Sequence, residues 1–141
     1  MKALTPYLFF PGNCKEAMNF YKSCFGGTLE IMTNNQAPQD ACPNDIKRDP
    51  EQIMHACLTQ GDFMLMASDN PMEKPKVGDH ISLNINCSTK EQTEKLFKTL
   101  GAGGTATMLL ADTFWGSYFG MLVDKYGIHW MLNCPLESAK S

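Results

Sequence analysis

Three histidines, His55, His80 and His129, are the side chains best suited to acid–base or metal chemistry in this chain. An imidazole titrates near neutral pH and is a common metal ligand. His80 opens an alternating segment in which Ser82, Asn84 and Asn86 share its parity. Alternation places these four side chains on one face of a strand. We expect this polar face to line a wet ligand pocket, with plain exposure to solvent as the alternative.

His55 lies in an apolar strand-like run, residues 53–60, and His129 shares its parity with Met131 in the last run of the chain. We expect His55 and His80 to converge on the pocket as a general base, a hydrogen-bonding pair or a non-standard metal site. His129 is expected to face the same pocket. The alternative for each is a structural histidine that is satisfied within the fold.

Phe114 and Trp115 precede Gly116, a residue that lets the backbone pass closely. Large aromatic rings here can wall an apolar pocket for a small organic ligand. A hydrophobic plug between modules and a dimer contact are the alternatives. Tyr118 is predicted from alternation alone to reach the pocket with its hydroxyl group.

The elements that must position these side chains occur twice along the chain. Capping-box patterns at residues 13–16 and 88–91 each open an amphipathic segment, and each segment ends at Gly-Gly-Thr. A strand is predicted before each helix, over residues 4–10 and 80–87. The strands predicted after the helices are residues 28–33, 53–60 and 63–67, and then residues 105–110, 117–123 and 128–133.

This order predicts an α+β fold of two βαβββ modules, because one module alone is too thin to bury both faces of its sheet. The first module is residues 1–67, the linker residues 68–79 and the second module residues 80–141. Together they should form one structural domain with a curved mixed sheet. Helices would cover its convex face, and its concave face would be a ligand cup. A long irregular segment, residues 34–50, is interpreted as a lid, a dimer contact or an insertion without a role.

Composition excludes several classes of function. A formal charge of −3 and the lack of a long basic cluster argue against nucleic acid as a partner. No apolar stretch is long enough for a membrane helix, and we expect a cytoplasmic, bacterial protein. The six cysteines are spread along the chain without C-x-x-C spacing, which favours reduced, buried side chains over disulfides or a zinc site.

Residues 112–130 carry the pattern D-x-F-W-G, F-G and D-x-x-G-x-x-W. This pattern resembles the PhnB-like branch of the vicinal oxygen chelate superfamily, which has the glyoxalase/bleomycin-resistance fold. The resemblance implies the two-module fold and a homodimer. Members of this branch often bear the label 3-demethylubiquinone-9 3-methyltransferase. The sequence has no glycine-rich nucleotide-binding turn after a strand, so it does not predict S-adenosylmethionine binding.

Metalloenzymes of that superfamily take one ligand from the first strand and one from the last strand of each module. Only His80 matches this set. The first strand, near residues 5–7, the run 63–67 and Met131 carry no ligand where the family pattern would place one. A standard four-ligand metal site is therefore not expected. No cofactor is predicted, although a divalent metal stays open.

The resemblance and the polar face together predict a protein that binds a small organic molecule in the cup. Its ligand is expected between His55, His80 and the Phe114–Trp115 pair. The first alternative is a metal-assisted lyase or dioxygenase that uses His80 and His55. The second is a resistance protein that sequesters a drug without catalysis.

Overall fold

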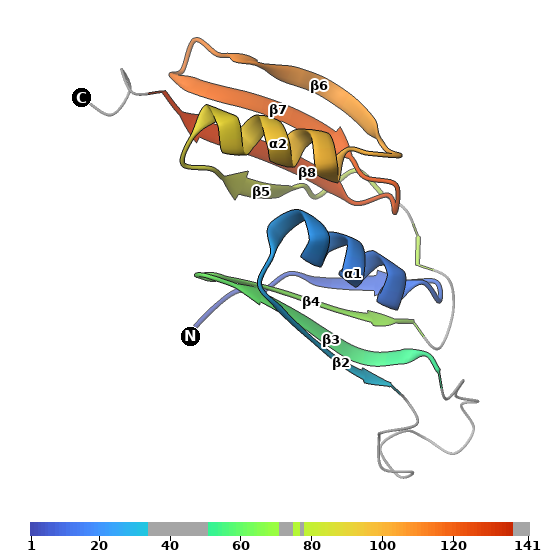
Figure 1. Ribbon diagram of the computed structural model, residues 1–141. Helices are drawn as coiled ribbons and strands as arrows, with labels where there is room; N and C mark the ends of the chain where they lie inside the picture. The colour runs from blue at the N-terminus through green and yellow to red at the C-terminus, as the bar shows by residue number, and fades with distance from the viewer. Residues whose placement is uncertain (34–50, 71–74, 77, 137–141) are drawn as a thin grey trace. The chain divides into compact units, whose positions relative to one another are not determined.

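The computed structural model describes residues 1–33, 51–70, 75–76 and 78–136. The chain divides into two compact units, residues 1–76 and 77–141 (Figure 1). This division falls inside the predicted linker, residues 68–79. The predicted role of residues 34–50 lies outside the described residues. The grouping of both modules into one structural domain stays a prediction.

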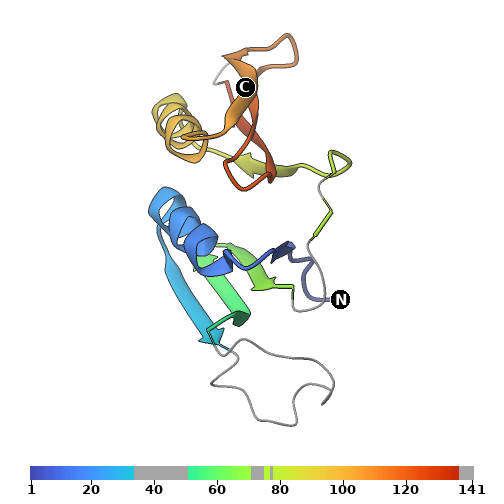
Figure 2. The same ribbon diagram turned by 90° about the vertical axis from the view of Figure 1, so that its right-hand side faces the viewer.

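The first unit is one four-stranded sheet with one helix. The sheet has the order β1-β4-β3-β2, in which β1 is parallel to β4 and the other neighbours are antiparallel. The helix covers one face of the sheet (Figure 2). Its elements are β1 (Tyr7–Phe10), α1 (Cys14–Phe25), β2 (Thr28–Thr33), β3 (Ile53–Gln60) and β4 (Phe63–Asp69).

The second unit repeats this topology with the strand order β5-β8-β7-β6. Its first strand is again parallel to its last strand, and the helix again lies on one face. The elements are β5 (Leu83–Asn86), α2 (Lys90–Leu100), β6 (Thr105–Asp112), β7 (Ser117–Val123) and β8 (His129–Pro135). The α+β fold and the twofold βαβββ order predicted from the sequence are confirmed.

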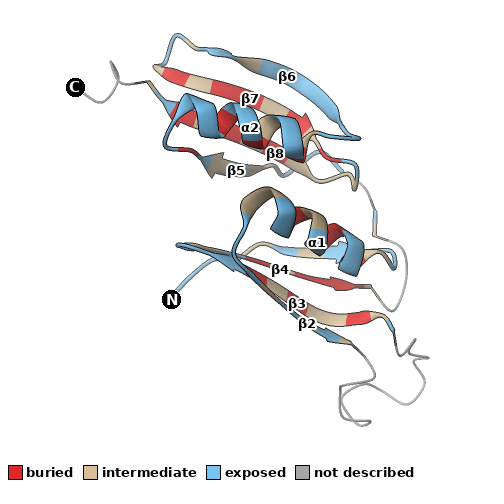
Figure 3. Ribbon diagram, viewed as in Figure 1, coloured by how far each residue is buried: buried red, intermediate tan, exposed pale blue. Residues whose placement is uncertain are grey.

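Each helix is held by an apolar stripe that packs on its sheet. Thr93, Leu96 and Leu100 of α2 are buried, as their spacing predicts. The sheet side of this core includes Trp130 and Leu132 on β8, both almost fully buried. Figure 3 shows further buried positions along β4 and β7. In α1 the buried residues are Cys14, Ala17, Met18 and Tyr21. No helix within the described ranges is long and apolar enough to span a membrane.

The capping of α2 differs from the prediction by one residue. The side chain of Thr89, not Ser88, accepts a hydrogen bond from the Gln92 amide at 3.1 Å. Gln92, not Glu91, returns the contact, because its Oε1 accepts from the Ser88 amide at 2.9 Å. Thr89 and Gln92 are three residues apart, as in a capping box, but the return bond of Gln92 reaches the amide of the residue before the N-cap and not the amide of Thr89.

The capping box predicted at Asn13 does not form. Its Oδ1 is buried and has no hydrogen-bond partner among the described residues. Asp69 of β4 serves this end of α1 instead, because its Oδ1 accepts from the Cys14 amide at 2.9 Å. A carboxylate at a helix N-terminus is also favoured by the helix dipole. A residue distant in sequence has therefore replaced the local cap.

Both first strands of the modules begin later than predicted. The first begins after Pro6, which lacks a backbone N–H. The second begins at Leu83, which pairs with Trp130 near the start of β8. The partner strand begins at His129, so His80 and Ile81 have no strand beside them. Strand alternation would place Ile81 under α2, but it is 72% exposed.

One glycine in each unit allows the chain to pass from helix to sheet. A Cβ on Gly27 would collide with the carbonyl oxygen of Thr59. A Cβ on Gly104 would collide in the same way with the carbonyl oxygen of Val123. Thr59 lies on β3, which pairs with the strand that follows Gly27, and Val123 lies on β7, which pairs with the strand that follows Gly104. The repeated Gly-Gly-Thr sequence is therefore a steric requirement of each module.

Candidate functional site

Asp124 organises the turn between β7 and β8. Its buried carboxylate accepts from the backbone amides of Tyr126 and Ile128, at 2.8 and 3.1 Å. The other carboxylate oxygen accepts from the indole Nε1 of Trp130 at 2.7 Å. Gly127 in the same turn has φ of 87°, which favours glycine. The D-x-x-G-x-x-W part of the sequence pattern thus joins a tight turn to a core tryptophan.

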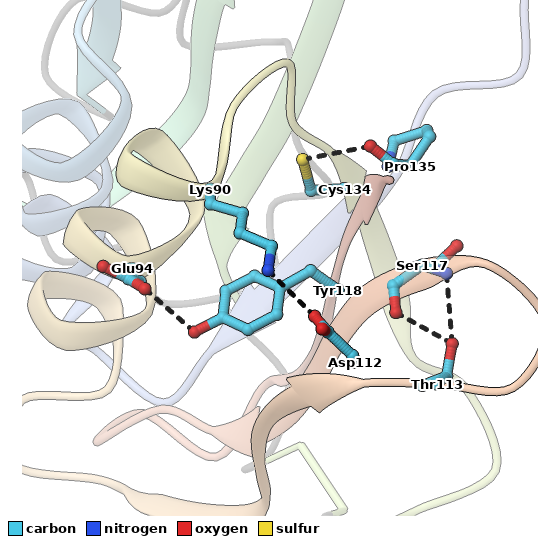
Figure 4. Close-up of polar contacts among 8 residues, drawn as sticks. All are labelled: Lys90, Glu94, Asp112, Thr113, Ser117, Tyr118, Cys134 and Pro135. Carbon is cyan, nitrogen blue, oxygen red and sulfur yellow. Dashed lines mark hydrogen bonds and ion pairs between the residues drawn. The ribbon is translucent and has the colours of Figure 1, made fainter. Parts of the chain in front are cut away.

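The turn between β6 and β7 exposes two aromatic side chains. Thr113 closes this turn, because its Oγ1 donates to the Ser117 carbonyl and accepts from the Ser117 amide, at 2.8 and 3.2 Å (Figure 4). Gly116 takes a positive φ of 89°. Phe114 is 97% exposed and Trp115 is 55% exposed. Their rings meet edge to face with centroids 5.1 Å apart.

Trp115 also contacts Phe119 of β7, with ring centroids 5.8 Å apart. Phe119 lies opposite Asn133 in the β7–β8 register, and Asn133 lies opposite Asn86 in the β8–β5 register. Residues directly opposite in a sheet point to the same face. The aromatic pair therefore borders a row of side-chain amides. We call this face, which lies away from α2, the open face of the second sheet.

Three asparagines form a connected group on that face. Asn84 Nδ2 donates to Asn86 Oδ1 at 3.1 Å, and Asn133 Nδ2 donates to the same oxygen at 3.3 Å. Both Asn84 and Asn86 are exposed, and Asn133 is half-buried. Asn84 and Asn133 each use one N–H of the side-chain amide in this group and have a second N–H. The side-chain amide of Asn86 serves as acceptor here, and its NH₂ group carries two N–H donors. The group therefore presents amide donors beside an aromatic wall.

The predicted polar residues of the second module lie in different settings. Asn84 is on the open face, as alternation predicted. His129 of β8 is half-buried and, by its parity with Asn133, lies on the same face. His80 is exposed and precedes β5, and the half-buried Ser82 immediately precedes that strand. Neither residue pairs with a neighbouring strand, so the directions predicted for their side chains no longer follow from strand alternation.

The predicted orientation of Tyr118 is wrong, because its side chain lies on the α2 face of the sheet. Its hydroxyl donates to Glu94 Oε1 at 3.0 Å, and the Lys90 Nζ lies 4.8 Å from its ring centroid (Figure 4). Lys90 also forms an ion pair with Asp112 at 3.0 Å. Desolvation, the hydrogen bond to Glu94 and the charges of Glu94 and Asp112 raise the pKa of Tyr118. The contacts of Lys90 and Glu94 with Tyr118 and Asp112 connect α2 to the β6–β7 hairpin.

His55 lies in the first unit, on the sheet face away from α1. Its Nδ1 is 3.3 Å from the hydroxyl of Tyr7, and the two ring centroids are 5.8 Å apart. His80 and His129 belong to the second unit. The predicted convergence of His55 with His80 therefore stays a prediction. Within the described ranges, no three His, Cys, Asp or Glu side chains gather as a possible metal site.

The sequence alone did not point to Phe119 and Asn133 as parts of the site. A signal for Asn133 was present: a buried Trp130 places residues 131 and 133 on the opposite face of the same strand. Phe119 could not be found in this way, because a phenylalanine in a strand is most simply read as core. Its partner Trp115 lies in a turn, whose direction alternation does not predict.

Two βαβββ units, each with a helix on one face and an open face on the other, define the vicinal oxygen chelate fold. A glyoxalase/bleomycin resistance protein/dioxygenase family enzyme from Burkholderia phytofirmans shares this fold, with a TM-score of 0.63 over 94% of this chain and 97% of that chain at 17% identity. The sequence profile described as 3-demethylubiquinone-9 3-methyltransferase matches residues 2–133. The chain belongs to this family, in the PhnB-like branch of the superfamily.

Two solved structures are similar at the level of sequence as well as fold. Protein PA1353 from Pseudomonas aeruginosa is 40% identical, with a TM-score of 0.84, and the match covers 97% of this chain and all of that chain (100%). A protein from Bacillus cereus described as a putative 3-demethylubiquinone-9 3-methyltransferase, PhnB protein, is 29% identical. Its TM-score is 0.74, over 94% of this chain and 99% of that chain.

Proposed function

We propose that the chain binds a small, oxygen-substituted aromatic molecule on the open face of the second sheet. The observation that carries this proposal is the row formed by Phe119, Asn133 and Asn86, with Trp115 against Phe119. An apolar wall beside a few convergent polar groups is the usual composition of a small-molecule site. The half-exposed indole ring offers a stacking surface, which an aliphatic ligand would use less well.

The amides set the polar chemistry of the ligand. A side-chain NH₂ group donates to carbonyl, hydroxyl or phenolate oxygens, and both donors from Asn84 and Asn133 already converge on one oxygen of Asn86. The remaining N–H groups favour a ligand with acceptor oxygens. Phenols, hydroquinones and quinones have such oxygens on an aromatic ring, and the family description names a quinone of this class. Methyl transfer would also need a methyl donor, for which the sequence has no recognisable motif.

Trp115→Ala should weaken binding of a phenol or quinone by about 100-fold. Stacking of a planar ring on an aromatic side chain, as measured for nucleic-acid bases, contributes roughly 1–3 kcal/mol. Trp115→Phe keeps an aromatic ring and should restore most of the affinity. The measurement is isothermal titration with a panel of phenols, hydroquinones and quinones, with cyclohexanol as the non-aromatic comparison.

Asn86→Ala should weaken the binding of the same ligands about tenfold.

Asn19→Ala is the matched control for Asn86→Ala, because Asn19 lies on the exposed side of α1 and its side-chain amide donates to the Lys15 carbonyl. Equal affinities of Asn86→Ala, Asn19→Ala and the unmodified chain would argue against the amide row. Equal binding of cyclohexanol and phenol would argue against the aromatic wall.

Retention of bulky cationic drugs, with no preference for phenols, would support drug sequestration instead. A lyase or dioxygenase that uses His80 and His55 would instead lose turnover in His80→Ala.

The homodimer implied by the family resemblance is proposed on the edge strand β6. Leu109 and Met108 of this strand are 74% and 46% exposed, and exposed apolar edge strands promote pairing between chains. Leu109→Glu should therefore shift the chain towards monomer in light scattering coupled to size exclusion. Leu4→Glu is the control, because Leu4 is 96% exposed in the first unit and precedes β1. An unchanged mass for Leu109→Glu would exclude this edge as the interface.

A further inference from the structure

The sheet face of the first unit that lies away from α1 carries a group of sulfur and imidazole side chains. Cys57 of β3 lies directly opposite Met66 of β4, and Met66 lies opposite Tyr7 of β1. His55 precedes Cys57 by two residues, so it shares the same face of β3. Met32 of β2 lies opposite His55. Strand pairing thus gathers one thiol, one imidazole and two thioethers, together with the exposed carboxylate of Glu30, which lies opposite Cys57 on β2.

Two side-chain contacts lie on this face, and the shared face itself follows from strand pairing and alternation. Cys57 Sγ lies 3.9 Å from the hydroxyl of Thr59, and the Tyr7 hydroxyl lies 3.3 Å from His55 Nδ1. The residues that alternate with them are Ala56 and Leu58, both fully buried on the α1 side. Cys57, His55 and Met66 are each half-buried. They are accessible to a small ion and are also shielded from bulk water.

We propose that this group binds Cu(I) through Cys57 Sγ, Met66 Sδ and a nitrogen of His55. Thiolate and thioether sulfur atoms are soft ligands that select Cu(I) over harder divalent ions, and imidazole also suits copper. Side chains opposite each other in an antiparallel pair have Cβ atoms about 4.5–5.5 Å apart, which lets two sulfur atoms reach one ion. Binding forms a Cu–S bond and releases the thiol proton to solvent. No electron is transferred.

Tyr7 can fix the tautomer of His55 for this role. When Nδ1–H donates to the Tyr7 oxygen, the lone pair for the metal is on Nε2. Histidine ligands of metals commonly donate their other N–H in this manner, and loss of such a partner weakens metal binding about 10–100-fold. Tyr7 is therefore a positioning residue and not a ligand.

Other cysteines of the described chain are poor competitors for the ion. Cys14, Cys87 and Cys134 are buried, and burial together with the charge of Asp69 raises the pKa of Cys14 to about 12. Cys24 is half-buried, as Cys57 is, but it lies on α1. Cys24→Ser is therefore a matched control for Cys57→Ser.

The test is competition for Cu(I) with bicinchoninate under anaerobic, reducing conditions, on the full chain. We expect one tightly bound Cu(I) per chain, a loss of at least about 100-fold in affinity in Cys57→Ser, and about tenfold in Met66→Leu. Tyr7→Phe should weaken binding by about tenfold without changing the stoichiometry. Cys24→Ser and Cys42→Ser should bind as the unmodified chain does.

Two further measurements keep the outcome decisive. Circular dichroism of each variant shows whether the fold is intact, and Ag(I), a diamagnetic substitute, should shift the His55 imidazole nitrogen signals in NMR spectra. Unchanged Cu(I) affinity in Cys57→Ser would overturn the site. An equal loss in Cys24→Ser would also overturn it, because binding would then follow the number of thiols and not this face of the sheet.

Discussion

Asp124→Ala is expected to lower the free energy of unfolding by about 3–5 kcal/mol, since hydrogen bonds to a charged group contribute roughly 1.5–3 kcal/mol each. The substitution removes the acceptor of two backbone amides and of the Trp130 indole N–H. All three donors lie in or near the core, where an unpaired donor is costly. The measurement is urea denaturation followed by circular dichroism and by tryptophan fluorescence.

Asp62→Ala is the control, because Asp62 occupies the exposed turn between β3 and β4 and should change stability by less than about 0.5 kcal/mol. Asp124→Asn should fall between the two, since its amide oxygen still accepts but the negative charge is lost. If Asp124→Ala unfolds within about 1 kcal/mol of Asp62→Ala, the turn does not depend on the carboxylate.

Asp69→Ala is expected to lower the free energy of unfolding by about 2–4 kcal/mol. Its buried carboxylate accepts from the Cys14 amide with one oxygen and from the Ile53 amide with the other, both at 2.9 Å. These bonds join the start of α1 and the start of β3 to β4. Asp79→Ala is the comparison in the same denaturation experiment, because Asp79 is exposed and precedes β5 in the sequence.

The thiol of Cys14 provides a second readout for Asp69. Burial and then the charge of Asp69 raise the pKa of Cys14 from 9.0 to about 12. Folding therefore keeps this thiol protonated, and the stability it contributes is present below pH 9 and is lost as the pH rises towards 12. Asp69→Ala should lower this pKa and speed the reaction of Cys14 with a thiol reagent. An unchanged rate, with unchanged stability, would contradict the assigned role.

The sequence predicted the repeat well because hydrophobic periodicity and Gly-Gly-Thr turns are local signals. The one-residue error in the α2 cap is local, but its other failures are tertiary. The Asn13 cap is replaced by Asp69, which lies far along the chain, and the β5 strand begins late because β8 offers no partner to His80. Tyr118 lies in a regularly alternating strand, as expected, yet its hydroxyl donates to Glu94 and its side chain lies on the α2 face. Strand parity indicates two faces, but it does not say which face a helix covers.

The candidate site shows the same division between local and distant information. Asn84 and the Phe114–Trp115 pair were predicted from polar alternation and from an aromatic pair before glycine. Phe119 joins them only through its contact with Trp115 and its register with Asn133. Register across strands from different hairpins depends on the whole sheet, and it was not present in any single segment of the sequence.

The two units have the same helix-covered face and different open faces. On the covered face a substitution must preserve a packed core. On the open face no helix restricts side-chain volume, and the two sheets differ there: the first carries Cys57, Met66 and His55, and the second carries Phe119, Asn133 and Asn86 beside His129. Each unit therefore offers a surface on which side chains can change with little cost to the stability of its core.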